Sequence, residues 1–196
     1  MNYVAHIHLA HVSKTSLLGN FMGDFVKGQA YRSLPDELSR GVQLHRKIDT
    51  FTDQHSSVLR LKRNFPDNIR RMSGVVLDIY FDHLLCRYWE KYSENSLEQV
   101  LDRFYQELEH STTQLSGRYS QVKQGLLEHR WLVTYQNLEN CLEIFFNIEK
   151  RLSRQVSFAE QSYQYLLANQ ADIEEHFLSF YPELVGYTHS ITHSNV

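Results

Sequence analysis

Apolar residues recur every three or four positions along almost the whole chain, a spacing typical of amphipathic helices. Runs with the strict alternation of a half-buried strand are nearly absent, and no Asn-Gly or Asp-Gly hairpin turn occurs. Only three prolines and eight glycines interrupt the pattern. The pattern therefore predicts a single all-α domain over residues 1–196, a helical bundle of about seven to nine helices.

The periodic segments also predict where the helices lie. We expect a short helix that ends near residue 10, followed by helices at 16–27, 36–54, 56–64, 71–91, 96–112, 119–135, 139–152 and 158–180. The sequence contains no internal repeat, low-complexity tract or clear linker. Nothing in it therefore divides the chain into two domains.

The segment at 36–54 places His45, Asp49 and Asp53 at successive four-residue steps. Residues four apart lie on the same face of a helix, so the three side chains form a ladder. Two carboxylates one turn apart repel each other unless a positive charge lies between them. The alternative is an exposed polar face with no ligand.

The segment at 71–91 is apolar around nearly its whole circumference, which predicts a helix inside the protein. Asp78 and Asp82 nevertheless lie one turn apart in its middle, with His83 beside them. Two buried carboxylates this close require a cation or many hydrogen-bond donors. Salt bridges to neighbouring helices are the alternative explanation.

Asp24 raises the same question in the stretch LLGNFMGDFV. Gly19 and Gly23 stand nearby at four-residue spacing, although glycine costs about 1 kcal/mol in a helix interior relative to alanine. Glycine is easier to explain where another backbone or a ligand must come close. A tight helix crossing, with Asp24 only as a cap, would explain the same residues.

Together these segments offer a mixture of carboxylate and imidazole ligands, which suits Mn²⁺, Mg²⁺ or Fe²⁺ better than a structural zinc ion. Along an ideal helix His45 and Asp53 are roughly 12 Å apart, too far to share one ion directly. Either two ions use the ladder, or one of its members orients the ligands.

The bulk composition excludes few classes of protein. A net charge of −3 and a pI near 6.4 give no general preference for nucleic acids or membranes. Cys86 and Cys141 have no spacing typical of a zinc or redox site, and two unpaired thiols suit a reducing compartment. No signal peptide or membrane-spanning run is visible, so we expect a soluble, cytoplasmic protein that binds neither nucleic acid nor membrane.

Several motifs, in order, resemble the bacterial acyl carrier protein phosphodiesterases over essentially the whole chain. The stretches are MNYVAHIHLAH, GNFMGDFVKG, HRKIDTFTDQH, LDIYFDHLL, WLVTYQNLENCLEIFFNIEKRLSR and FLSFYPEL. The resemblance implies a hydrolase that removes the 4′-phosphopantetheine arm from the serine of holo-acyl carrier protein. It also implies a helical fold like that of the HD phosphohydrolases and a preference for manganese. However, the chain contains no adjacent His-Asp pair and offers only Asp82-His83 in the reverse order.

The matching motifs supply candidates for each step of phosphodiester hydrolysis. A metal can ionise water near neutral pH and neutralise phosphate charge, and a histidine can protonate the departing alkoxide. We expect His6 to be this acid, although a core histidine bonded to a carbonyl is the alternative. Asp53 and His83 would orient ligands or water. The expected metal ligands are Asp24, His45, Asp49, Asp78 and Asp82.

Two further sets of residues are candidates for substrate contacts. Arg46 and Arg154 could bind phosphate oxygens, because a guanidinium fits them well, or could form structural salt bridges. The segment RLKRNFPDNIRR is a basic surface that could dock an acidic carrier protein, or a solvated loop. Its cationic residues are Arg60, Lys62, Arg63, Arg70 and Arg71.

Two other functions fit the same sequence. The metal site could serve a nucleotide or small-molecule phosphohydrolase, which would release nucleoside or phosphate instead of phosphopantetheine. The chain could also be a helical interaction module without enzymatic activity, with its acidic residues paired to arginines. Such a module would retain no stoichiometric Mn, Fe or Mg after dialysis.

Overall fold

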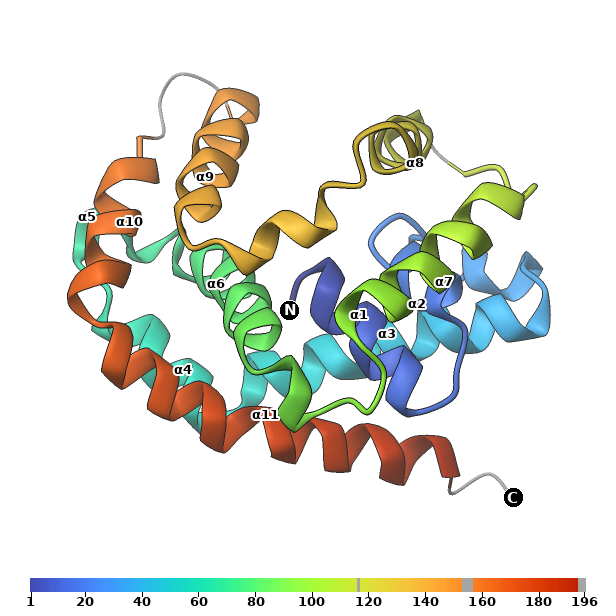
Figure 1. Cartoon of the computed structure of the whole chain (residues 1–196), viewed down its shortest axis with the longest axis horizontal. Coiled ribbons are helices and arrows are strands. Elements are labelled where there is room, and N and C mark those ends of the chain that lie inside the picture. The colour runs from blue at the N-terminus through green and yellow to red at the C-terminus, as the bar shows by residue number, and fades with distance from the viewer. Residues whose placement is uncertain (116, 153–156, 194–196) are drawn as a thin grey trace.

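The computed structural model describes residues 1–115, 117–152 and 157–193, and they form an all-α domain (Figure 1). No strand occurs in these ranges, as the sequence predicts. The elements are α1 (Tyr3–Val12), α2 (Leu17–Met22), η1 (Ala30–Ser33), α3 (Asp36–Gln54), α4 (Ser56–Asn64), α5 (Asp67–Arg70), α6 (Ser73–Arg87), η2 (Trp89–Lys91), α7 (Leu97–His110), α8 (Gly117–His129), η3 (Trp131–Gln136), α9 (Glu139–Arg151), α10 (Ala159–Ala168) and α11 (Gln170–His193).

The described helices outnumber the seven to nine expected, because some predicted segments are broken and the short helices η1 and α5 lie between predicted ones. The segment predicted at 119–135 divides at Arg130, whose φ of 45° is left-handed and ends α8 before η3. The segment predicted at 158–180 divides at Asn169 into α10 and α11. Helix α11 then continues through Pro182, which lies inside it. Helical periodicity does not reveal such breaks, since both halves keep the same spacing.

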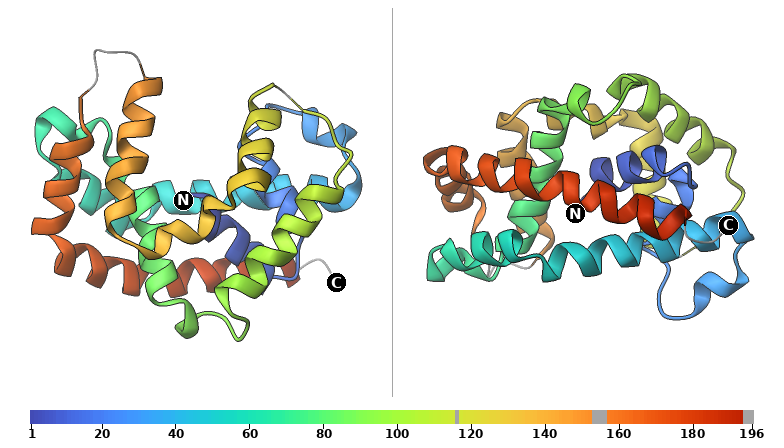
Figure 2. Two further views of the ribbon diagram at one scale, coloured as in Figure 1. Left: turned by 45° about the horizontal axis from the view of Figure 1, so that its top comes forward. Right: turned by 90° about the horizontal axis from the view of Figure 1, so that it is seen from below.

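Helix α6 is the buried centre of the fold. Its apolar residues pack on all sides, as the hydrophobic circumference predicts, and it contacts α1, α4, α9, α11 and η3. The long helix α11 lies across one side of the molecule, against α3, α4 and α6 (Figures 1 and 2). None of the helices in the described ranges is long and apolar enough to cross a membrane.

Helices α2 and α3 cross at a glycine contact, which sets the position of the site. A Cβ on Gly41 would lie 2.6 Å from the carbonyl carbon of Gly19, and a Cβ on Gly19 would lie 2.8 Å from the carbonyl oxygen of Leu38. Both distances are to backbone atoms, so neither helix could make room for a side chain. Gly19 therefore has the role of close approach that its spacing predicts, and Gly41 is its partner.

Candidate metal centre

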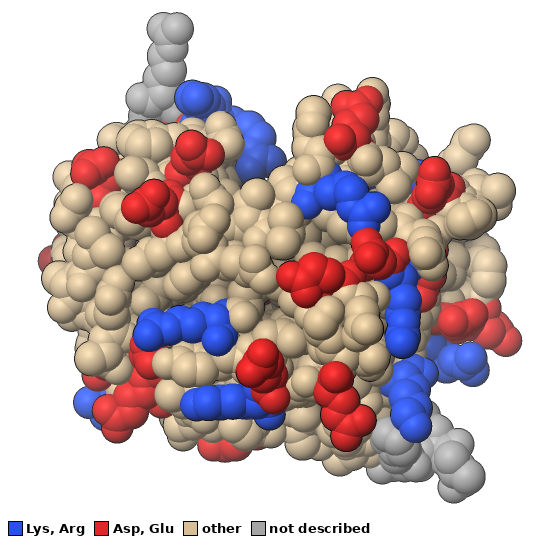
Figure 3. All heavy atoms as spheres, in the orientation of Figure 1, with Lys and Arg blue, Asp and Glu red and all other residues tan. Residues whose placement is uncertain are grey.

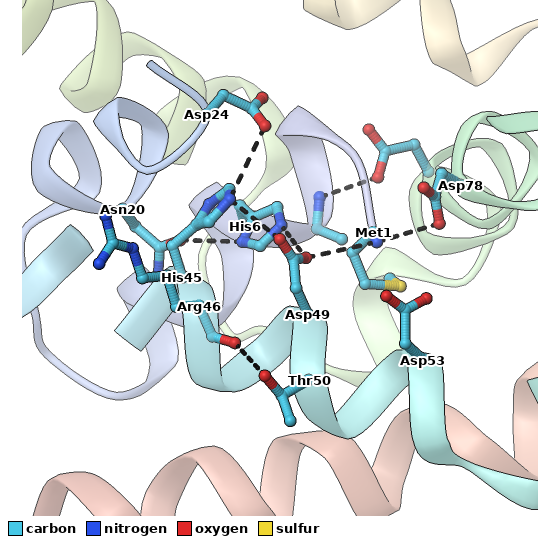
Figure 4. Close-up of polar contacts among 12 residues, drawn as sticks. Met1, His6, Asn20, Asp24, His45, Arg46, Asp49, Thr50, Asp53 and Asp78 are labelled. Atoms are coloured by element: carbon cyan, nitrogen blue, oxygen red, sulfur yellow. Dashed lines mark hydrogen bonds and ion pairs between the residues drawn. The ribbon is translucent and has the colours of Figure 1, made fainter. Parts of the chain in front are cut away.

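The centre of the candidate site is formed by His6 of α1 and by His45 and Asp49 of α3 (Figure 4). His6 Nε2 lies 3.1 Å from Asp49 Oδ1, and His45 Nε2 lies 3.1 Å from Asp49 Oδ2. The two imidazole rings are stacked, with centroids 3.9 Å apart. Both histidines are buried, whereas the Asp49 side chain is 41% exposed. The site is therefore a buried pair of imidazoles below a carboxylate that reaches the surface.

Asn20 of α2 orients the His6 ring. When His6 donates Nδ1–H to Asn20 Oδ1, at 2.9 Å, its Nε2 presents a lone pair to the Asp49 carboxylate. Two electron pairs facing each other at 3.1 Å require a proton or a metal ion between them. Asn20 was not among the expected residues; its only sequence signal is an amide side chain within the apolar stretch LLGNFM.

Burial and the neighbouring charged groups shift the pKa values of His6 and Asp49. Burial lowers the pKa of His6, and the neighbouring His45 lowers it further. Burial raises the pKa of Asp49, but the neighbouring imidazoles of His45 and His6 outweigh it and bring this pKa well below its usual range. Asp49 is therefore ionised at neutral pH, and His6 tends to be neutral, the forms in which both can bind a metal.

Gly23 makes room for the His45 ring. A Cβ at position 23 would lie 2.1 Å from His45 Cγ, closer than any real contact. The glycine directly before Asp24 thus lets the turn at residues 23–25 lie over the imidazole. This explains the second glycine of the GNFMGDF stretch.

Asp24 and Asp78 extend the cluster on either side (Figure 4). Asp24 Oδ1 lies 3.7 Å from His45 Nε2, and its side chain is 38% exposed. Asp78 is 37% exposed, so the expectation that it is buried in α6 is wrong. Asp82, one turn further along α6, is fully buried, so the two carboxylates have different surroundings.

The α-amino group of Met1 occupies the space between two of these carboxylates. Its nitrogen is buried, 3.0 Å from Asp78 Oδ1 and 3.7 Å from Asp49 Oδ1. Burial alone would lower its pKa, but Asp78 and Asp49 raise it above the usual value. This ammonium shows that the two carboxylates favour a positive charge between them. No sequence pattern indicates this contact.

The donor set fits a divalent transition metal. Ligand atoms of His6, His45 and Asp49 lie within 4.8 Å of one another, which makes them the one candidate metal group in the described residues. Two imidazoles and a carboxylate suit Mn²⁺, Fe²⁺ or Zn²⁺ better than Mg²⁺, which prefers oxygen ligands. A metal-binding histidine normally donates its second N–H, and His6 does so to Asn20. His45 Nδ1 is buried and has no such partner among the residues that the structure describes.

Asp82 has a different role from the one expected. It is fully buried, and its two oxygens accept hydrogen bonds from the backbone N–H groups of Val4 and Ala5, at 2.8 and 3.0 Å. It therefore supports the first turn of α1, where the backbone N–H groups have no partners within the helix. Because both of its oxygens are occupied in this way, we assign Asp82 to positioning α1 and not to binding metal.

Asp53 and His83 also lie outside the central group. Asp53 is 69% exposed and forms a salt bridge of 2.8 Å with Lys62 of α4. His83 stacks on Tyr80, and its Nδ1 hydrogen-bonds the carbonyl oxygen of Tyr135. Of the His45–Asp49–Asp53 ladder, the first two members lie together at the site, and the third pairs with a lysine.

Arg46, one of the two arginines expected at the phosphate, contacts the backbone of a nearby turn. Arg46 donates to the carbonyl oxygens of Gly28 and Val26, both at 2.8 Å, and its guanidinium lies over the Tyr31 ring. It therefore braces the turn that follows Asp24. Arg154 lies outside the described residues.

The expected docking segment is only partly available as a basic surface. Lys62 is paired with Asp53, and Arg70 contacts Asp67 and the carbonyl oxygen of Phe65. The three remaining cations, Arg60, Arg63 and Arg71, are exposed around α4 and α5. Their role in docking stays a prediction.

Comparison with known proteins assigns the chain to a family. A family model described as acyl carrier protein phosphodiesterase matches residues 1–184. A protein of that name from Pectobacterium atrosepticum is 31% identical over 186 residues, which cover 94% of this chain and 96% of the relative. Relatives of the same name include one from Escherichia coli O157:H7, 30% identical over 95% of this chain and 96% of the relative, and one from Klebsiella pneumoniae, 31% identical over 94% and 96%. No solved structure matches the chain.

Proposed function

The chain belongs to the acyl carrier protein phosphodiesterase family and is a phosphodiesterase, and we propose that it removes 4′-phosphopantetheine from the serine of holo-acyl carrier protein in a metal-dependent reaction. The product would be the apo-carrier protein. The closeness of His6, His45 and Asp49 supports the metal dependence, because one ligand atom from each lies within 4.8 Å of the others. The two buried, unpaired cysteines suit a reducing cytoplasm, where we place the reaction.

We assign metal binding to His6, His45 and Asp49, with Asp24 and Asp78 completing the ligands from the exposed side. When bound there, a divalent ion would supply Lewis acidity and a nucleophile that ionises near neutral pH. The presence of two nitrogen ligands favours Mn²⁺ or Fe²⁺ over Mg²⁺. This assignment moves His6 from the role of proton donor to that of ligand, because its Nε2 points into the group.

The protein's own residues prepare the site for this chemistry. Asn20 holds the His6 ring, and Asp82 holds the first turn of α1, which carries His6. Arg46 fixes the turn that follows Asp24. The ligands are therefore oriented before a substrate arrives, which lowers the cost of ordering them during the reaction. We propose that the overall arrangement is related to that of the HD phosphohydrolases, although the sequence lacks their adjacent His-Asp pair.

One mass measurement tests the proposed function. Holo-acyl carrier protein is incubated with the protein and Mn²⁺, and the mass of the carrier is followed with Asp24→Ala as the control. We expect the carrier to lose the phosphopantetheine arm with the wild type and to keep it with the variant. A carrier that keeps its arm with both proteins would refute the proposal.

The two other candidate functions give different results in companion assays. A nucleotide phosphohydrolase would release nucleoside or phosphate from nucleotides more efficiently than phosphopantetheine from the carrier. An interaction module would hold no stoichiometric Mn, Fe or Mg after dialysis, and Asp24→Ala would leave its partner binding intact. Of these functions, the family and the donor set together favour the carrier protein phosphodiesterase.

A further inference from the structure

A hollow lies beside the metal centre, between α8 and α9, with η3 beneath it. The two helices stand apart on either side of η3 (Figures 1 and 2), and the space-filling view is indented between them, with basic side chains on both sides (Figure 3). Tyr3, at the start of α1, contacts the floor of this α8–α9 hollow through its ring. The ring lies 5.8 Å from Trp131 of η3, edge-on, and 5.4 Å from Phe21.

Arg118 reaches this tyrosine from the α8 side. Its guanidinium carbon lies 5.7 Å from the centre of the Phe25 ring, which packs against Phe21 with ring centres 5.2 Å apart. Arg118 and Tyr3 therefore flank the same pair of aromatic rings. The Arg118 side chain is exposed. No carboxylate in the described ranges lies within salt-bridge distance of this arginine, whereas Arg70, Arg87 and Arg130 each have one.

Arg151 approaches from the α9 side. By helical spacing, Asn140, Asn147 and Arg151 share a face of α9, and Asn140 Nδ2 donates to the carbonyl oxygen of Thr134 on the η3 floor. That bond turns this face toward the hollow. Arg151 Nε donates to the carbonyl oxygen of Asn147, and the other guanidinium nitrogens remain as donors. In the part of the chain that the structure describes, no acidic side chain is bridged to Arg151.

The charges around Tyr3 connect both arginines to the metal centre. Burial raises the pKa of Tyr3 to about 12, and Asp24 raises it, while Arg118 and Arg151 lower it. The charges of Asp24, Arg118 and Arg151 are therefore all felt at the Tyr3 hydroxyl. Tyr3 therefore stands at the border between the acidic metal centre and a cationic patch made by two separate helices.

A phosphodiester needs such a patch to approach this centre. One divalent ion and the Met1 ammonium would only balance the charges of Asp24, Asp49 and Asp78, so the added negative charge of a phosphodiester calls for further cations. A guanidinium binds two phosphate oxygens with its parallel N–H groups. Arg46, which the sequence suggests for this purpose, is bonded to backbone carbonyls instead.

We propose that Arg118 and Arg151, with the Tyr3 hydroxyl between them, bind the phosphate of the phosphodiester substrate on the side of the site opposite the metal ligands. This inference rests on the proposed phosphodiesterase function and adds residues that recognise the substrate. Since the arginines come from α8 and α9, the bound phosphate would join the two walls of the hollow.

The test compares Arg118→Gln, Arg151→Gln and their combination with the wild type on two substrates. The substrates are holo-acyl carrier protein and bis(p-nitrophenyl) phosphate, a small diester without a protein surface. We expect kcat/KM to fall on both substrates, by about tenfold or more per arginine, the equivalent of one charged hydrogen bond. The inhibition constant of inorganic phosphate should rise in parallel, and Arg118→Lys should recover part of the loss. Arg40→Gln, an exposed residue of α3, is the matched control and should change neither substrate.

Two results would overturn the inference. If kcat/KM falls only on the carrier protein, the arginines contact the protein and not its phosphate. If it falls on neither substrate, they do not take part in recognition. Failure of the proposed function gives a separate result: the wild type would cleave the small diester but leave the carrier intact, and the arginine variants could still be tested on the small diester.

Discussion

The imidazole rings of His6 and His45 are stacked, with 18° between their planes, and each points its Nε2 at a different oxygen of Asp49. The two residues come from different helices, 39 positions apart in the sequence, and meet only because α1 and α3 pack together. Stacking fixes both ring planes, so the two nitrogens converge on one carboxylate. This convergence is the geometric basis of the proposed metal site.

Asp49→Asn should remove the metal while leaving the fold intact. An amide cannot balance the charge of a divalent ion, and Asp49 is the one carboxylate that both imidazoles contact. We expect activity to fall by at least about 100-fold, because even the residues that only orient metal ligands cost 10- to 100-fold when changed. Metal content after dialysis, measured with the circular dichroism spectrum, checks this. Asp102→Asn, an exposed carboxylate paired with Arg130, should retain both metal and activity.

Gly41→Ala should destabilise the protein strongly. The added Cβ would lie 2.6 Å from the backbone of Gly19, and overpacking of this kind costs about 1–3 kcal/mol. Gly186→Ala in α11 is the matched control, since nothing lies within 4 Å of its added Cβ and alanine is favoured over glycine in a helix by up to about 1 kcal/mol. Urea unfolding of both variants measures the difference. Equal stability of the two would contradict the close crossing of α2 and α3.

Asp82 should make the stability of the fold depend on pH. Burial raises its pKa from 3.8 to about 7, despite the hydrogen bonds from Val4 and Ala5. Between these values the folded chain holds a proton that the unfolded chain has lost, so the contribution of Asp82 to stability falls as pH rises toward 7. Asp82→Asn removes this proton exchange.

The measurement compares the free energies of unfolding of the wild type and Asp82→Asn from about pH 5 to about pH 8, a range that brackets the raised pKa of Asp82. The wild type should lose stability relative to the variant across this range, by at least about 1.4 kcal/mol, the equivalent of one pKa unit. A constant difference between the two proteins would show that Asp82 does not titrate there.

The exposed arginines near α5 can be tested as a docking surface. Replacing Arg63, Arg70 and Arg71 with Glu should raise the KM for holo-acyl carrier protein, because long-range attraction to an acidic partner becomes repulsion. The same triple variant should hydrolyse a small phosphodiester normally. Equal loss on both substrates would show that the substitutions damage the fold or the site and would refute the docking role.

The fold class follows from the sequence because helical periodicity is a local property. The buried position of α6 follows from its hydrophobic circumference, and the close approach at Gly19 from its cost within a helix. The break at Arg130 could not be predicted, because a left-handed backbone at an arginine leaves no mark on the spacing of apolar residues.

Only the part of the candidate site that lies within one helix could be predicted, because spacing along a helix is also a local property. His45 and Asp49 share a helix face, so their closeness follows from their spacing. Asp78 and Asp82 share the same spacing, yet one reaches the site and the other supports the backbone of α1. That difference depends on which neighbour packs on each side of α6, and this is information from tertiary structure. The Met1 amine and the Asn20 amide enter the site through the same kind of long-range packing.

The central residues of the site all precede position 80, whereas the walls of the hollow come from α8 and α9. The N-terminal part of the chain would therefore carry the hydrolytic residues, and the later helices would contact the substrate. Substitutions in the later helices could change which phosphoryl compound is admitted without disturbing the chemistry beneath. We would then expect sequence differences among relatives in α8 and α9 to change substrate preference, while the residues of the metal centre stay the same.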